Sequence, residues 1–94
     1  MLDDDSLVLV VFHASWCVSC KNVLPIIDEV DESYGDKLKV VKIDVDDQEN
    51  GAIIEKYAIR SVPTTMLLKN TEPVEFLFGY SSKDQMISMI ERNV

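Results

Sequence analysis

The amino-acid sequence predicts one small α/β domain with a four-stranded mixed sheet and helices on both of its faces. Three observations lead to this prediction. A continuous apolar run near the start has the length of a buried strand, and helical and strand-like patterns then alternate along the chain. The chain has 94 residues, which suits a single domain over residues 1–94, because two domains would leave too few residues for two cores.

The first half of the chain predicts a strand, a helix and a second strand. Residues 7–12 form a β-favouring apolar run that suits a strand buried on both faces. Residues 18–34 carry apolar side chains at helical spacing with acids on the other side, and Gly35 is placed to end this helix. Residues 38–45 predict the second strand, parallel to the first and joined to it by a right-handed crossover.

The second half predicts a short helix, a hairpin and a last helix. Polar residues from Asp46 offer a cap for a helix that extends through Ala58. Residues 64–69 and 74–78 predict two antiparallel strands, with a turn at 70–73 between them. Ser82 and Gln85 have the spacing of a capping box, which begins the last helix. The resulting order is βαβαββα.

Composition excludes several classes of function. The formal net charge is −8, whereas nucleic acids and acidic membranes are bound by positive patches. No apolar run approaches the roughly 20 residues that cross a bilayer. The first residues are acidic, unlike the basic start of a secretory signal. We therefore expect a cytoplasmic protein without nucleic-acid or membrane partners.

The two cysteines of the chain, Cys17 and Cys20, predict a redox centre. They follow a buried strand directly and open a helix, where unpaired backbone N–H groups and the helix dipole favour a thiolate at Cys17. Cys20 lies one turn later on the same helix face, close enough to attack a mixed disulfide on Cys17. A bond that closes so short a loop adds little chain-entropy stability, so it suits chemistry better than stapling.

Two other interpretations of the cysteine pair were weighed. A structural zinc site generally has four ligands, and this chain offers two cysteines and His13, so a complete site would need a second subunit. A buried, inert cysteine pair is the other alternative. Both are weaker than the redox interpretation, and we expect no metal.

These motifs resemble the thioredoxin family from about Ser6 to Val94. The matching segments are VFHASWC at 11–17, Cys20-Lys21 with Pro25 and Asp28-Glu29, KID at 42–44, KYAIRSVPT at 56–64, and Gly79. The resemblance implies a minimal thioredoxin fold, without the strand and helix with which thioredoxins begin.

The same resemblance implies a docking surface around the cysteines. It places a cis peptide bond between Val62 and Pro63 opposite them, and the Val62 backbone would pair with an extended substrate strand. Trp16 is expected to form an exposed apolar rim beside Cys17, which Gly79 and Tyr80 complete. The plainer alternatives are a proline that starts a strand and a tryptophan that fills the core.

The chain departs from the family pattern near the cysteines. Val18-Ser19 replaces the usual Gly-Pro, which leaves the preferred direction of electron flow open. Val11 stands where the family has a buried aspartate, so Lys42 loses that partner and is expected to be solvated. His13 is either a packed or surface histidine or a titrating group that partly replaces the carboxylate.

The expected function is thiol–disulfide exchange with protein disulfides, mainly as a reductant. Cys17 would attack and Cys20 would resolve, with no cofactor besides their own redox-active disulfide. The protein, expected to be a monomer, would be recycled by another dithiol or a flavin-dependent reductase. An oxidant or isomerase is the alternative within this chemistry, and a thioredoxin-fold docking module without catalysis is the alternative outside it.

Overall fold

The structure, a computed structural model, describes residues 7–94 and contains the expected succession of strands and helices. Short 3-10 turns, Gly35–Lys37 and Gln48–Asn50, precede the second strand and the second helix. The elements are β1 Leu7–His13, α1 Val18–Tyr34, β2 Lys39–Asp44, α2 Gly51–Lys56, β3 Thr64–Lys69, β4 Glu72–Phe78 and α3 Lys83–Arg92.

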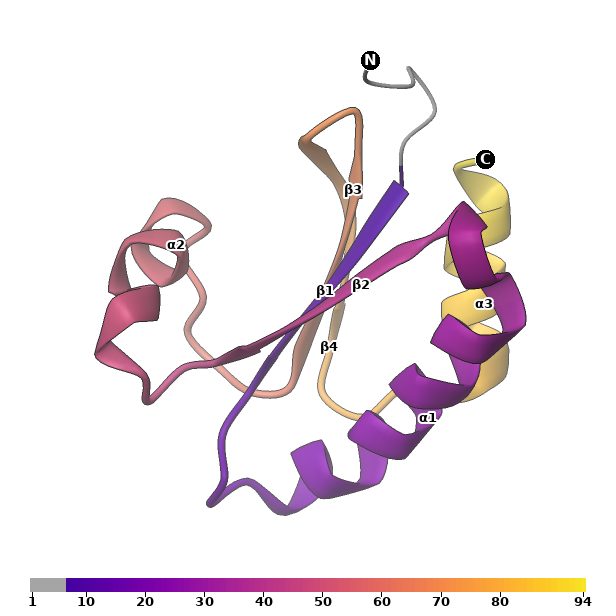
Figure 1. Cartoon of the computed structure of the whole chain (residues 1–94). Coiled ribbons are helices and arrows are strands. Elements are labelled where there is room, and N and C mark those ends of the chain that lie inside the picture. The colour runs from indigo at the N-terminus through magenta and orange to yellow at the C-terminus, as the bar shows by residue number, and fades with distance from the viewer. Residues whose placement is uncertain (1–6) are drawn as a thin grey trace.

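The four strands form one mixed sheet in the order β2-β1-β3-β4. β1 pairs with β2 in parallel and with β3 antiparallel, and β3 pairs antiparallel with β4. β1 therefore lies inside the sheet, and its side chains are buried on both faces, which accounts for its continuous apolar sequence. Its C-terminal end delivers the chain to the cysteines (Figure 1).

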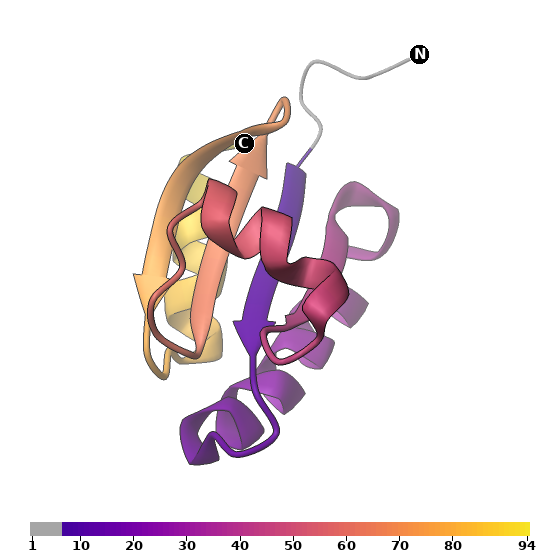
Figure 2. The same ribbon diagram turned by 90° about the vertical axis from the view of Figure 1, so that its left-hand side faces the viewer.

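Two helices cover one face of the sheet and one short helix covers the other (Figures 1 and 2). We name the first the closed face, because α1 and α3 pack side by side over it and bury its apolar side chains. Leu9 and Val11 of β1 lie in this core with Val23 and Ile27 of α1 and Met86 of α3, all of them fully buried. Alternation along β1 assigns Leu7, Leu9 and Val11 to this side.

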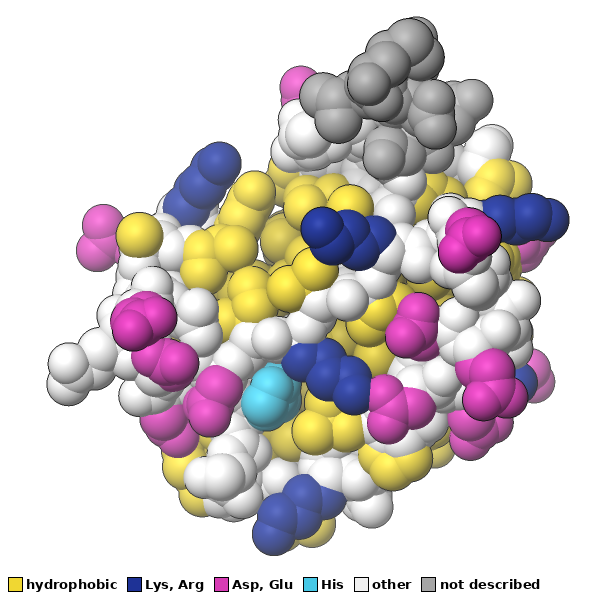
Figure 3. Space-filling view, viewed as in Figure 1, with side chains coloured by type: hydrophobic (Ala, Val, Ile, Leu, Met, Phe, Trp, Pro, Cys, Tyr) yellow, Lys and Arg dark blue, Asp and Glu magenta, His cyan; other side chains and the backbone are white. Residues whose placement is uncertain are grey.

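We name the second side the open face, because α2 has six residues and covers only part of it. Val10, Phe12 and Met66 are buried there beneath α2, whereas Val8 and Val41 remain partly exposed. Figure 3 shows hydrophobic surface between α2 and the edge at β2. The two faces of the sheet are thus sealed to different degrees.

Local sequence accounts for the ends of the helices. Gly35 adopts φ +54° after α1, a conformation that favours glycine, and its N–H donates to the Asp31 carbonyl. At α3 the expected capping box forms: the Gln85 N–H donates to Ser82 Oγ at 3.2 Å, and the Ser82 N–H donates to Gln85 Oε1 at 2.8 Å.

The hairpin differs from the sequence prediction. β4 begins at Glu72, not at residue 74, and the turn consists of Asn70 and Thr71 with φ of +55° and +70°. Positive φ at both positions matches the twist of a two-residue hairpin turn. Pro73 is tolerated inside β4 because this is an edge strand and the register shifts opposite it, between Leu67 and Leu68.

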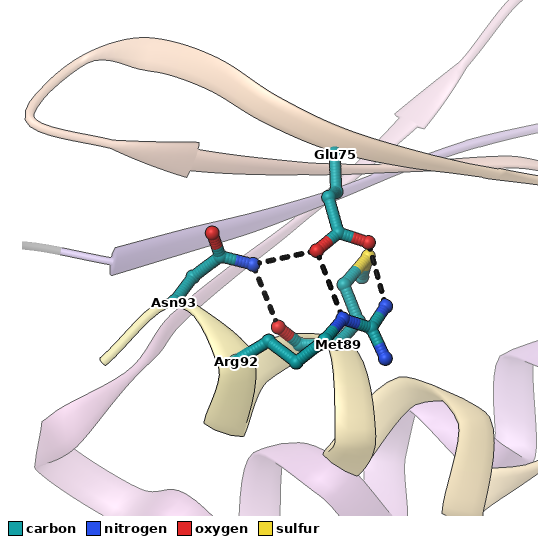
Figure 4. A network of polar contacts seen from close by, with 4 residues as sticks. All are labelled: Glu75, Met89, Arg92 and Asn93. Atoms are coloured by element: carbon teal, nitrogen blue, oxygen red, sulfur yellow. Dashed lines mark hydrogen bonds and ion pairs between the residues drawn. The ribbon is translucent and has the colours of Figure 1, made fainter.

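Polar contacts attach α3 to its neighbours. Glu75 of β4 accepts from Arg92 Nε at 3.2 Å and Nη2 at 2.7 Å, and from Asn93 Nδ2 at 2.9 Å (Figure 4). The Tyr34 hydroxyl at the end of α1 donates to Glu91 Oε2 at 2.6 Å. The last turn of α3 is therefore joined both to the hairpin and to α1.

Candidate active site

Cys17 is the N-cap residue of α1. After β1 ends at His13, the chain makes a turn in which the Cys17 N–H donates to the Ala14 carbonyl at 3.2 Å. Cys17 itself is extended, and its Sγ accepts a hydrogen bond from the Cys20 N–H at 3.2 Å. A sulfur in this position faces unpaired N–H groups of the first helical turn, which stabilise negative charge.

The segment before β3 approaches Cys17 from the other side. The Cys17 thiol donates to the Val62 carbonyl across 3.6 Å, and the Val62–Pro63 peptide bond is cis, as the resemblance implied. The Gly79 N–H donates to the Pro63 carbonyl at 2.9 Å, so the end of β4 adjoins the same place. The fold thus brings Cys17 together with Val62, Pro63 and Gly79.

Cys20 differs from Cys17 in its surroundings. Its side chain is fully buried against Ala14 and Cys17, whereas Cys17 retains 7% exposure. Burial, with a smaller contribution from the side-chain hydrogen bond to Cys17, raises the pKa of the Cys20 thiol to about 11. Both sulfurs are free thiols in this structure. The arrangement therefore has one sulfur at a helix N-terminus, on a residue that keeps slight exposure, and one fully buried sulfur a turn later.

Trp16, which precedes Cys17, and Tyr80, which follows Gly79, lie at the surface. Their exposed fractions are 67% and 55%, so Trp16 does not fill the core. The indole Nε1 of Trp16 donates to Asp46 Oδ2 at 2.8 Å, which fixes the ring over the loop after β2. The sequence prediction assigned Asp46 only a capping role, since an aspartate after a strand gives no signal of a partner 30 residues away.

A small apolar cavity of about 140 Å³ lies beside Trp16. Its walls come from the loop after β2, from α2 and from the segment that leads to the cis proline. The lining residues are Trp16, Val45, Ile54, Ile59, Arg60, Ser61 and Val62. The cavity therefore adjoins Cys17 through Val62, whose carbonyl accepts from the thiol.

Three residues bear on proton transfer at Cys20. Val11 is fully buried in the closed face. His13 is half-buried at the end of β1, and among residues 7–94 no hydrogen bond joins its imidazole to either thiol. Lys42 is exposed, as expected, and in addition forms an ion pair with Asp28 of α1. α1 passes close to β2, a proximity that the sequence pattern does not reveal.

Within the described residues, no group of three or more His, Cys, Asp or Glu side chains is placed to hold a metal ion. Over the same residues, no helix has the length and apolar character to cross a membrane.

The chemistry that the site itself offers is the making and breaking of sulfur–sulfur bonds. An accessible sulfur would exchange with a partner's disulfide, and a second sulfur one turn away would complete the exchange.

Comparisons with known proteins agree with this site. The thioredoxin family model matches residues 1–92. The thioredoxin of Bacillus subtilis (strain 168) is 40% identical over 90 residues, which cover 96% of this chain and 85% of that protein. The thioredoxin of Rickettsia prowazekii (strain Madrid E) is 39% identical over 94 residues, which cover 100% of this chain and 88% of that protein. A solved structure described as that of a malarial protein has a TM-score of 0.86 and 26% sequence identity. The match covers 96% of this chain and 99% of that chain.

Proposed function

The chain belongs to the thioredoxin family, and we propose that it reduces disulfides in protein substrates through Cys17 and Cys20. One observation carries this proposal. Cys17 is the N-cap of α1, with its sulfur bonded by the Cys20 N–H at 3.2 Å and adjacent to the Val62 carbonyl. A sulfur so placed faces the unpaired N–H groups of the first helical turn and lies beside backbone that can pair with an extended segment.

The first step is attack by the Cys17 thiolate on one sulfur of the substrate disulfide. A Cys17–substrate disulfide forms, the substrate S–S bond breaks, and the other substrate sulfur leaves as a thiolate that takes a proton. The Val62 backbone would hold the substrate strand beside Cys17, while Trp16, Gly79 and Tyr80 form the rim around it. Attack by Cys17 before Cys20 follows from exposure, because the Cys20 sulfur is fully buried.

The second step is attack by Cys20 on the Sγ of Cys17. Cys20 first loses its proton, and its thiolate then forms the Cys17–Cys20 bond while the second substrate sulfur departs as a thiol. The substrate gains two electrons and the dithiol of this protein loses two. Because burial raises the pKa of Cys20 to about 11, its deprotonation is the demanding part of this step.

The remaining parts of the proposal concern the cell. The protein carries no cofactor besides its redox-active disulfide, acts as a monomer in the cytoplasm, and is returned to the dithiol by another dithiol or a flavin-dependent reductase. Such a cycle would serve cellular redox homeostasis and electron transfer to protein disulfides.

The half-buried His13 is the candidate for assisting proton transfer, since it ends the strand that leads to the cysteines.

The order of attack is tested by alkylation and trapping. Reduced protein is treated with substoichiometric iodoacetamide near neutral pH, and we expect the label on Cys17. Cys20→Ser is then expected to retain a substrate as a mixed disulfide, whereas the matched Cys17→Ser variant retains little. Preferential labelling of Cys20, or equal trapping by both variants, would contradict the assignment.

The direction of electron flow has a specific alternative. Val18, between the cysteines, is 73% exposed, and residues at this position tune the stability of the disulfide relative to the dithiol. Equilibration of the Cys17–Cys20 pair against glutathione measures its reduction potential and so distinguishes a reductant from an oxidant or isomerase. A potential near −270 mV is typical of a reductant, and one near −120 mV is typical of an oxidant. A docking module would keep its biological activity when both cysteines are replaced by serine.

A further inference from the structure

A groove of about 320 Å³ lies on the flank of the molecule, outside the site described above. Its walls are the segment that follows α2 and the open face of the β3–β4 hairpin, which run beside each other in Figure 2. The residues that matter here are Tyr57, Ile59, Arg60, Ser61, Phe76 and Phe78.

Aromatic side chains form the hairpin wall of this groove. Phe76 and Phe78 are two residues apart on β4 and therefore point to the same face. Their rings stack with centroids 5.9 Å apart and planes within 3°. Phe78 is nonetheless 70% exposed. Exposed apolar surface of this kind, with Tyr57 on the opposite wall, marks an interaction site more often than a surface without function.

Positive charge borders the same groove. Arg60 is exposed, and among the ion pairs of residues 7–94 none involves its guanidinium. The Lys56 ammonium lies 5.3 Å from the centroid of the Tyr57 ring. The chain as a whole has a formal net charge of −8, so these cations differ in sign from the overall charge of the protein. Their charge is complementary to a carboxylate on a partner.

The groove is continuous with the candidate active site. It shares Ile59, Arg60 and Ser61 with the cavity beside Trp16. Ser61 precedes Val62, whose carbonyl accepts from the Cys17 thiol, and Phe78 precedes Gly79, whose N–H donates to Pro63. Because the groove lining begins at Ser61, one residue before Val62, a polypeptide held beside Val62 reaches the groove within a few residues of its cysteine.

We propose that this groove is a second docking subsite for the disulfide-bearing polypeptide, and that it selects an aromatic side chain with a carboxylate next to it. The aromatic ring packs on Phe78 and Tyr57, and the carboxylate pairs with Arg60. This inference rests on the proposed function. It further predicts that protein disulfides flanked by such an aromatic–carboxylate pair react fastest.

The test uses short peptides whose single cysteine carries 5-thio-2-nitrobenzoate as a mixed disulfide. Attack by Cys17 on the peptide sulfur releases the yellow thiolate, and the release rate is divided by that of the mercaptoethanol analogue, which has no peptide. Three residue pairs are compared, Phe-Glu, Phe-Lys and Ala-Gln, each placed three residues from the cysteine. Each pair is tested in two peptides, one with the pair before the cysteine and one with the pair after it. We expect Phe-Glu to react about tenfold faster than Ala-Gln on the better side.

Variants assign the preference to the groove. Phe78→Ser is expected to abolish the advantage of Phe over Ala, and Arg60→Glu to reverse the preference between Glu and Lys. Val74→Ser is the matched control, because Val74 is also an exposed apolar residue of β4 but does not line the groove. In Val74→Ser the tenfold preference should remain.

The outcomes separate this inference from the proposed function. If the mercaptoethanol analogue also fails to react, the proposed function fails. If it reacts but the wild-type protein treats all three peptides alike, the docking inference is overturned and the exchange chemistry stands. The groove could instead be occupied by a second copy of this chain. Sedimentation of the wild type and of Phe78→Ser tests this alternative. A wild-type dimer that Phe78→Ser dissociates would make the groove a self-association surface and overturn the proposal.

Discussion

The two faces of the sheet are built from similar side chains but are covered differently. On the closed face, α1 and α3 bury Leu9, Val11 and Val23 completely. On the open face, α2 supplies six residues, and Val8 and Val41 keep part of their surface in water. The cavity beside Trp16 is lined in part by α2 and the segment after it, and the groove is lined by that segment and the β3–β4 hairpin. The comparison places the most completely buried core on one face and the proposed recognition surfaces on the other.

The largest effect should come from placing a charge in the closed face. Val11→Asp is expected to lower the free energy of unfolding by about 3–5 kcal/mol, since a buried carboxylate replaces packed methyl groups. Val11 packs in one cluster with Val23, one helical turn after Cys20. Burial should raise the pKa of the new carboxyl group, which makes it a better proton acceptor for Cys20 near neutral pH.

Stopped-flow release of a thiol from a preformed Cys17 mixed disulfide measures this step. Release should be faster in Val11→Asp than in the wild type, while the first attack changes little. Val11→Asn is the control, because an amide is polar but does not accept a proton near neutral pH. Equal acceleration by both variants, or no acceleration in a folded Val11→Asp, would show that deprotonation of Cys20 does not limit release.

A matched pair of truncations compares the two faces directly. Val11→Ala removes methyl groups from a fully buried strand position of the closed face and should cost about 2 kcal/mol. Val41→Ala makes the same change on the open face, where the side chain is partly exposed, and should cost less than about 1 kcal/mol. Urea unfolding at constant m-value measures both. Equal losses would mean that α2 seals its face as well as α1 and α3 seal theirs.

The closed face also contains a polar defect. Thr65 is fully buried, and its Oγ1 has no hydrogen-bond partner among the described residues. Val is nearly isosteric and favours strands, so Thr65→Val is expected to raise the free energy of unfolding by about 1 kcal/mol. Thr65→Ser keeps the hydroxyl and should not stabilise. A destabilised Thr65→Val would show that the hydroxyl has a partner of energetic importance.

Much of the fold was predictable because local sequence and tertiary packing agree. Apolar spacing and Gly35 gave α1 its observed bounds, and residues 64–69 were predicted as the strand that forms β3. The start of β4 was missed because Pro73 and Glu72 disfavour strands locally, whereas the antiparallel pairing with β3 accommodates both. Sequence patterns describe the tendencies of one segment and do not report such pairing.

The candidate site divides in the same way. The cysteine pair was predictable because its residues are adjacent in the chain and directly follow a strand. The contact of Trp16 with Asp46 and that of Lys42 with Asp28 were not, because they join segments whose distance depends on the finished fold. The stack of Phe76 and Phe78 was missed for another reason. The sequence pattern describes both only as strand residues, and the exposure of Phe78 depends on how little of the open face α2 covers.

The smallest effect concerns a contact at the rim of the closed face. The pKa of Tyr34 is raised to about 12 by burial and by its hydrogen bond to Glu91. Since the folded-state pKa exceeds that of the unfolded chain, this contribution is complete below about pH 10 and is lost as the pH rises through 12. Tyr34→Phe should cost about 1 kcal/mol at neutral pH, with a gap from the wild type that closes in alkali. A gap that is constant with pH would contradict the assignment.

The two outer strands of the sheet also bear on aggregation. An unpaired strand edge can add a strand from any extended polypeptide, and proteins discourage this with lysines, prolines and bulges. β2 carries Lys39 and Lys42 on one edge, and β4 carries Pro73 opposite a register shift on the other. Neither edge is a good template for cross-β growth. If extended segments bind at Val62 as proposed, the protein is in this way protected from polymerising along the borders of the described sheet, and strand addition is confined to the place proposed for the sulfur chemistry.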